Sequence, residues 1–431
     1  MSPSPASQEA VGGEASSRRG SLHVALSVLA FAAVALLVWS FWLPAEHRYF
    51  NYETRTHGFN WDLKVYYAAG NNWALGIDPY GNQYQPPTVK ITGRAPIRFK
   101  GQTTVRFIYL PTLLPAYRWL AHLPYRKLRY DWLYLNFAVL AAAAVVAVAL
   151  ERGRRLEVTA AILLLGVVSF PLLYHIREGN IDMIVAGLAT SGFLLYGRYR
   201  SWPAAILLAL AVVTKLTPLL VVAALGSYYR DWRFLAKTLS ATAVLVALSL
   251  IWVPAHFYDE AAHVLFVRSR SMTGYVNQSA MRLLFNVPWG ARIAGVLAFA
   301  GLLVGLYALG RRRMARTDSI ARHGEAPDMR VFMLTCWVML LFSPIAWIWT
   351  YVWVIIPLAM LLVGRQRVRG TAALAMLLVA AALMSAPIAR HGPVLDLLTM
   401  LGGVVGLACL VLCVIGVIDV GHKPGAAASL R

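Results

Sequence analysis

The run PAAILLALAVVTKLTPLLVVAALGSYY, residues 203–229, decides the fold class. It is apolar almost throughout, and basic clusters flank it at 197–200 and 228–233. Because basic residues collect in the cytoplasmic loops of membrane proteins, both ends of the run are predicted to lie on one side. The run therefore predicts a hairpin of two short helices, broken at Lys215-Leu216-Thr217-Pro218 toward the outside. Such a break at membrane depth is stable only where it lines a polar cavity.

The composition of the whole chain agrees with this interpretation. Of its 431 residues, 59% are hydrophobic and 14% are charged, and the mean hydropathy is +0.60. Soluble domains are much less apolar, so we predict an all-α polytopic membrane protein. The net charge of +21 is interpreted mainly as a topology signal, with some basic groups left to meet anionic lipid or phosphate. Cys336, Cys409 and Cys413 lie in apolar runs and indicate neither a disulfide nor a metal site.

The distribution of charge predicts about 10 full transmembrane helices plus the hairpin, with both termini in the cytoplasm. The apolar runs lie at 22–43, 107–123, 131–150, 158–174, 181–197, 203–229, 235–254, 291–309, 331–345, 349–363, 371–387 and 396–418. The run 107–123 contains two prolines and Arg118 and is predicted to be interfacial or re-entrant, because a full crossing would place the basic cluster 151–155 outside.

This topology divides the chain into three parts. Residues 1–20 are predicted to form a disordered cytoplasmic tail, 21–420 a transmembrane domain, and 421–431 a second cytoplasmic tail. The long loops 44–130 and 255–290 both fall on the outer face. Long loops on one side only indicate that binding or chemistry takes place there.

The stretch NWDLKVYYAAGNNWALGIDPY, residues 60–80, supplies the candidate catalytic group. In a short helix that begins near Asn60, Asp62 and Tyr66 share one face, and the small residues at 68–70 allow close packing. An Asp of ordinary pKa, about 3.9, is ionised at neutral pH and can accept a proton from a hydroxyl. The competing interpretation is an acid that only stabilises the helix N-terminus.

Two cations are candidates for binding an anion. Lys215 is an ionisable residue inside an apolar run, which makes it a functional candidate unless it merely extends to the interface. Arg177 lies in a polar segment on the predicted outer face and could bind phosphate or simply pair with Glu178. In the same segment, Asn180 and Asp182 could cap the following helix.

Two further groups of residues could contact a phosphate or a sugar. Arginine, amide and aromatic side chains suit these ligands. The alternatives are a solvated outer loop for the first group and an aromatic belt at the membrane interface for the second. The residues are Arg268, Arg270, Asn277, Gln278, Ser279 and Arg282 in the second long loop, and Trp347 and Trp349 near the end of the 331–345 run. No Asp-x-Asp triplet, phosphate-binding glycine loop or CxxC motif occurs, so we expect no cofactor and assign no metal ligand.

The order of motifs resembles glycosyltransferase family 87. The motifs are DLKVYYAAG with GIDPY, FIYLP, EGNID, KLTP, NQS followed by Arg282, and SPIAW, spread over about 60–355. This resemblance implies a GT-C-like membrane fold, use of polyprenyl-phosphate sugars, and Asp62 as the catalytic aspartate. Mannosyltransferase members resemble SPxSWxHH at the last motif, where this chain has Trp349 and Thr350 in place of the histidines.

Together these observations predict an inverting glycosyltransferase with Asp62 as general base. It would move a hexose or pentose, mannose being the first expectation, from a polyprenyl-phosphate donor to a glycolipid or envelope glycan acceptor. The predicted location is the bacterial plasma membrane, in contact with membrane lipids and with no nucleic acid partner, and the active site would face outward. The alternatives are a lipid or glycan transporter or flippase, and a non-catalytic scaffold of envelope assembly.

Overall fold

The chain is almost entirely helical where its structure is described, which confirms the predicted all-α class. The computed structural model describes residues 61–80, 88–89, 97–98, 107, 109–151, 153–199, 201–266, 288–316, 327–342, 348–364, 366–368, 371–385, 401 and 404–411. The helices are α3 (Trp61–Ala74), η2 (Pro111–Leu113), α4 (Leu114–Ala121), α5 (Tyr125–Leu150), α6 (Arg155–Val168), α7 (Phe170–Glu178), α8 (Asp182–Tyr199), α9 (Trp202–Thr214), α10 (Pro218–Tyr229), α11 (Trp232–Ser249), α12 (His256–Phe266), α14 (Pro288–Arg316), α15 (Met329–Phe342), η5 (Ile348–Val354), α16 (Ile355–Val363) and α17 (Thr371–Ser385). The two-residue strands β1 (Thr88–Val89) and β2 (Ile97–Arg98) form a small antiparallel ribbon.

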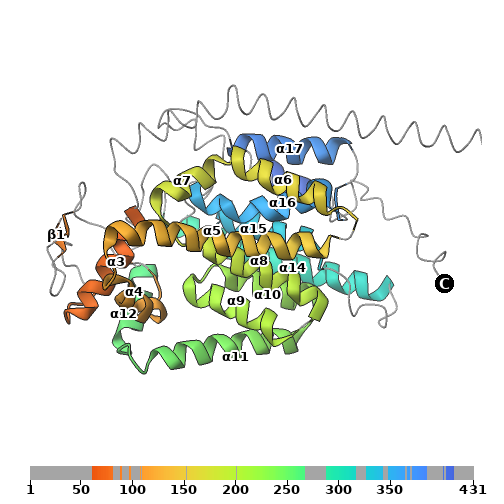
Figure 1. Cartoon of the computed structure of the whole chain (residues 1–431). Helices are drawn as coiled ribbons and strands as arrows, with labels where there is room; N and C mark the ends of the chain where they lie inside the picture. The colour runs from red at the N-terminus through yellow and green to blue at the C-terminus, as the bar shows by residue number, and fades with distance from the viewer. Residues whose placement is uncertain are drawn as a thin grey trace, which may run out of the picture.

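Helices α8 and α15 form the centre of the bundle (Figure 1). Helix α8 packs between α5 and α9, and α15 is buried over nearly its whole length. Helices α3, α4 and α12 gather at one end of the bundle, on the left in Figure 1, where α3 packs on α4. The carboxylate of the 60–80 stretch therefore lies at the end of the helical bundle.

The predicted break in the 203–229 run is confirmed. Helix α9 ends at Thr214, Lys215 has an extended backbone with φ −152° and ψ 136°, and α10 begins at Pro218. Proline has no N–H to donate to the preceding turn but is well tolerated in the first turn of a helix, so it separates the two helices here. On which side of a membrane this break lies remains a prediction.

The run 158–174, predicted as one helix, is instead two helices. Helices α6 and α7 meet at an angle of 63°. Pro171 lies in the first turn of α7, and the hydroxyl of Ser169 accepts a hydrogen bond from the backbone N–H of Leu172. A proline and a serine cap start a new helix, and apolar composition alone did not reveal this.

The two predicted outer loops contain short helices. Helix α4 has eight residues and cannot span a membrane, in keeping with the interfacial or re-entrant helix expected at 107–123. Residues 255–290 were predicted as a loop, but helix α12 begins at His256, so the first part of that segment is helical. Its later part, with all six candidate residues between 268 and 282, lies outside the described residues.

Helix length by itself does not establish the predicted number of crossings. Within the described ranges, the segment Lys127–Leu150 alone is long and apolar enough to span a membrane, and α6 with α7 would add a second span if the bent pair is one. Seven further apolar helices among the described residues have between 10 and 17 residues. The first apolar run, 22–43, lies outside the described residues, as do both predicted tails.

Candidate active site

Helix α3 carries Asp62 in its first turn and lies close against α4. A Cβ placed on Gly70 would overlap the backbone carbonyl of Tyr117, so only glycine permits this approach. On the same face, the ring of Tyr66 stacks on that of Tyr117, with centroids 5.1 Å apart and planes within 8°. The small residues at 68–70 thus have the packing role predicted for them, and they fix the helix that carries the carboxylate.

The turn that follows α3 positions a second aromatic residue, Tyr109, near Asp62. The carboxylate of Asp78 accepts a hydrogen bond from the backbone N–H of Tyr80 at 2.8 Å, which closes a tight turn. The Tyr80 hydroxyl then donates to the backbone carbonyl of Tyr109 at 2.6 Å. The GIDPY motif therefore positions Tyr109, whose hydroxyl accepts a hydrogen bond from Tyr66 at 2.8 Å.

Between α7 and α8 the chain makes a sharp turn, which a glycine permits and a hydrogen bond from α5 stabilises. Gly179 is in the left-handed region with φ 66°, which side chains disfavour, and it ends α7. The indole of Trp132 on α5 donates to the Gly179 carbonyl at 2.8 Å. This segment of three residues, 179–181, is called the α7–α8 junction below.

The first N–H groups of α8 are hydrogen-bonded by side chains of this region. The Asn180 side-chain oxygen accepts from the N–H of Asp182 at 2.8 Å, and His175 Nε2 accepts from the N–H of Met183 at 3.0 Å. Free N–H groups at a buried helix start are costly, so these contacts stabilise the junction. The predicted capping role of Asn180 is confirmed, and His175 is a second cap that sequence reasoning missed.

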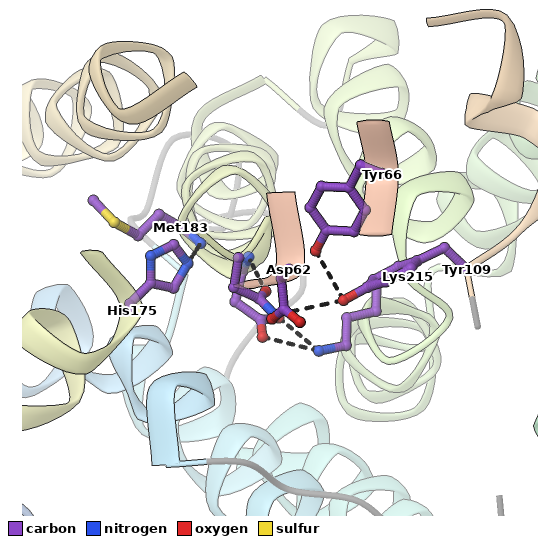
Figure 2. A network of polar contacts seen from close by, with 8 residues as sticks. Asp62, Tyr66, Tyr109, His175, Met183 and Lys215 are labelled. Carbon is purple, nitrogen blue, oxygen red and sulfur yellow. Dashed lines mark hydrogen bonds and ion pairs between the residues drawn. The ribbon is translucent and has the colours of Figure 1, made fainter. Parts of the chain in front are cut away.

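Asp62 is hydrogen-bonded to this junction (Figure 2). The amide nitrogen of Asn180 donates to Oδ2 of Asp62 and, at 3.4 Å, to the hydroxyl of Tyr109. Asp62 and Tyr66, predicted to share one helix face, are thus joined through Asn180 and Tyr109. Asn180 is buried, whereas Asp62 is half-buried and keeps part of its surface open.

Lys215 joins the same group of residues from the α9–α10 break. Its ammonium lies 2.7 and 2.9 Å from the two carboxylate oxygens of Asp182. The Asp182 side chain is fully buried, and that of Lys215 is 22% exposed. The lysine of this apolar run is therefore paired with an acid of the neighbouring helix α8. Sequence reasoning treated Asp182 as a cap and did not identify it as this partner.

The environment raises the pKa of Asp62 to about 6. Burial is the largest cause, since it disfavours the charged form, and the charge of Asp182 adds to it. The hydrogen bond from Asn180 and the charge of Lys215 act in the opposite direction. Burial also raises the pKa of the Tyr109 phenol, which stays protonated beside the carboxylate. Asp62 is thus ionised at neutral pH yet more basic than an exposed aspartate.

Arg177, the other predicted cation, is paired and buried. Its guanidinium lies 2.8 Å from the carboxylate of Glu178 and 4.5 Å from the ring centroid of Tyr174. Both charged side chains are less than 9% exposed, so the expected pairing is present but is not a surface contact. Burial lowers the pKa of Lys64 on α3, while the charge of Glu178 acts in the opposite direction.

The remaining predicted residues are not placed by the described structure. Trp349 falls in η5, where its side chain is outside the described part, and Trp347 lies just before it. Six further candidates also lie outside the described residues: Arg268, Arg270, Asn277, Gln278, Ser279 and Arg282. Among the described residues no group of three His, Cys, Asp or Glu side chains could hold a metal ion.

The site thus combines a carboxylate of raised pKa with a buried lysine–aspartate pair. The sequence model of glycosyltransferase family 87 matches residues 107–344, which is more than half of the chain. The protein therefore belongs to glycosyltransferase family 87, as its motifs predicted. Asn180, Asp182 and Lys215 lie within the match, whereas Asp62 precedes it. No curated protein and no solved structure matches the chain.

Proposed function

We propose that this glycosyltransferase is a polytopic membrane enzyme that transfers a sugar from a polyprenyl-phosphate donor by direct displacement. The sugar is a hexose or pentose, with mannose the first to test, and the acceptor is a glycolipid or an envelope glycan. The reaction takes place at the outer face of the bacterial plasma membrane. One observation carries the proposal: a half-buried, unusually basic carboxylate, Asp62, lies in one hydrogen-bonded group with a lysine–aspartate pair.

The outward surface of the bundle supports embedding in a membrane. Large apolar side chains are exposed on its outer helices, for example Val244 and Leu248 on α11 and Val296 and Val304 on α14. In the best candidate span, Lys127–Leu150, only 17% of the apolar window is buried inside the protein. Soluble proteins rarely expose contiguous apolar surface of this kind, whereas lipid chains cover it at no cost in hydration.

Asp62 acts as the general base in this proposal. Its carboxylate accepts the proton of the acceptor hydroxyl, and the resulting oxygen attacks the anomeric carbon of the donor sugar. The bond from that carbon to the phosphate oxygen breaks, and polyprenyl phosphate leaves with the bonding electrons. A single displacement inverts the anomeric configuration and requires no covalent enzyme intermediate.

Lys215 stabilises the departing phosphate. An ammonium has three N–H donors, and two of them face the oxygens of Asp182. Within the described residues the third has no hydrogen bond, and it is available to the phosphate. Because the phosphate gains charge as it leaves, a fixed cation lowers the barrier, by about 3 kcal/mol for a contact of the oxyanion-hole type. Arg177 is buried and paired with Glu178, which makes it the weaker candidate for the phosphate contact.

Transfer by the purified protein tests this function. The protein in detergent or liposomes is supplied with one sugar as its polyprenyl-phosphate ester or as its nucleotide ester, together with a glycolipid acceptor. Transfer from the lipid donor, with inversion, is expected. Transfer from the nucleotide sugar alone would refute the donor assignment. The transporter alternative has no support from the family match, and it predicts movement of an unchanged lipid across the liposome membrane.

A further inference from the structure

The structure assigns Asn180 as the positioning residue of the proposed base: its side-chain amide, locked by the start of α8, holds and stabilises the charged form of Asp62. This assignment rests on the proposed function, since it takes Asp62 to be the base. Asn180 was interpreted from sequence only as a helix cap. The proposal gives it a second role, directed at the protonation of the residue that reacts with the acceptor.

The hydrogen bonds of Asn180 allow only one orientation of its amide. The oxygen accepts from the N–H of Asp182, and the nitrogen donates to Asp62 and to the Tyr109 hydroxyl. With the amide reversed, its oxygen would face the carboxylate of Asp62 and its NH₂ group would face the N–H of Asp182. Both donors and the acceptor are satisfied in the observed orientation alone. The side chain is buried, so water cannot replace these contacts.

The surroundings of Asp62 give this hydrogen bond an effect on basicity. Among the described residues, the charged groups near the carboxylate are Asp182 at the start of α8 and Lys215 at the α9–α10 break. The neutral phenols of Tyr66 and Tyr109 also face it. Burial and Asp182 favour the protonated form of Asp62, whereas Asn180 and Lys215 favour the ionised form. Asn180 is the larger of the two opposing influences. Without it the base would be protonated over more of the neutral range.

Two substitutions separate positioning from simple capping. Asn180→Ala removes both the cap and the donor. Asn180→Asp keeps an oxygen to accept the N–H of Asp182, so it retains the cap while it replaces the donor by a second acid. A merely structural role would make the alanine variant unstable but leave the titration of Asp62 in it unchanged. The assigned role predicts that both variants change the titration of Asp62.

The measurement is the pH dependence of carbodiimide labelling at Asp62, quantified by mass spectrometry of the full-length protein in detergent. This reagent modifies the protonated carboxyl, so labelling of the wild type should rise as the pH falls through about 6. Loss of a hydrogen bond to a charged group should raise the midpoint by about one to two pH units in Asn180→Ala. Asn180→Asp should raise it at least as much, because two adjacent carboxylates cannot both ionise easily.

Asn136→Ala is the matched control. Asn136 is also buried, and its amide donates to the carbonyl of Trp132 on the same helix, without contact to Asp62. Its loss should leave the labelling midpoint unchanged. The acid limb of kcat/KM should shift in parallel with labelling in any Asn180 variant that retains activity.

An unchanged midpoint in both folded Asn180 variants would overturn the assignment. That failure is distinct from failure of the proposed function, which would show as normal turnover by Asp62→Asn. Because labelling requires no turnover, an inactive Asn180 variant still gives a decisive midpoint.

Discussion

Two interruptions of the apolar helices meet at the candidate site, and they are built differently. At the α7–α8 junction, the side chain of Asn180 and that of His175 on α7 accept hydrogen bonds from the first N–H groups of the next helix. In the α9–α10 break, the side chain of Thr217 does not cap α10, and its buried hydroxyl has no hydrogen-bond partner among the described residues. The first is fixed by hydrogen bonds, whereas the second is tied to the site through Lys215. We infer that the junction orients the base and that the break supplies the cation.

The largest effect is expected from the carboxylate that faces the junction. Asp62→Asn keeps the shape of the side chain and can still accept the hydrogen bond from Asn180, but it cannot take a proton. Loss of a general base typically lowers the rate by about 10² to 10⁴-fold. The measurement is single-turnover transfer from the lipid donor, and an Asp62→Asn protein with the wild-type rate would refute the role of Asp62.

Stability provides the control for this variant. The folded state raises the pKa of Asp62 from 3.8 to about 6, so it binds a proton more tightly than the unfolded chain does. The contribution of Asp62 to stability therefore increases as the pH falls from about 6 toward 3.8, and it is unfavourable at neutral pH. Asp62→Asn should be at least as resistant to thermal unfolding as the wild type at pH 7. A large loss of stability would mean that reduced transfer reflects misfolding.

The next largest effect is expected from the cation of the break. Lys215→Ala leaves the fully buried carboxylate of Asp182 without its partner. Breaking a buried pair costs about 3–5 kcal/mol, and less here because water reaches the lysine. The loss should appear both as a lower temperature of unfolding and as weaker use of the lipid donor.

A double variant separates these two consequences. In Lys215→Ala with Asp182→Asn, no unpaired charge remains buried. The double variant should therefore be more stable than the sum of the two single losses predicts. Use of the lipid donor should stay impaired, because the phosphate still lacks its cation. Recovery of both properties would show that Lys215 has only a structural role.

The pH dependence of the wild type is expected to be of intermediate size. The base must be ionised to accept a proton, and the pKa of Asp62 is about 6. Below that value kcat/KM should fall about tenfold for each pH unit, while above it this group should impose no further change. An acid limb near pH 4 would indicate that burial does not raise the pKa of Asp62 during turnover.

The contrast between junction and break also shows what could be predicted from sequence. Lys215 and Pro218 mark the break directly, because a charge and a residue without an N–H both disfavour a continuous apolar helix. The bend at Ser169 was missed, although Pro171 follows it, because an apolar run was taken to be one helix. Local signals were reliable where a residue type dictates backbone geometry.

Contacts between distant residues could not be predicted in the same way. Asp182 and Lys215 are 33 positions apart, and their pairing depends on how α8 packs against α9. Tyr66 and Tyr109 are 43 positions apart and meet through the turn at Asp78 and Tyr80. Sequence alone could identify Asp62 as a candidate, but its basicity depends on these packed neighbours.

The smallest effect is expected from the hydroxyl in the break, and a matched pair of variants measures it. Thr214 and Thr217 lie on either side of Lys215, and Thr214 donates to the carbonyl of Leu210 at 2.7 Å. Thr214→Val loses this hydrogen bond and should cost about 1 kcal/mol. Thr217→Val loses no hydrogen bond seen in the structure and should change stability by less than about 0.5 kcal/mol. Thermal unfolding of both variants checks the difference.

Thr217→Val could prove as stable as the wild type but use the lipid donor poorly. The Thr217 hydroxyl would then contact the phosphate together with Lys215, and both residues of the break would bind the donor. If Thr217→Val is as destabilised as Thr214→Val, the break is more tightly held than its hydrogen bonds indicate, and the distinction between the two interruptions is wrong.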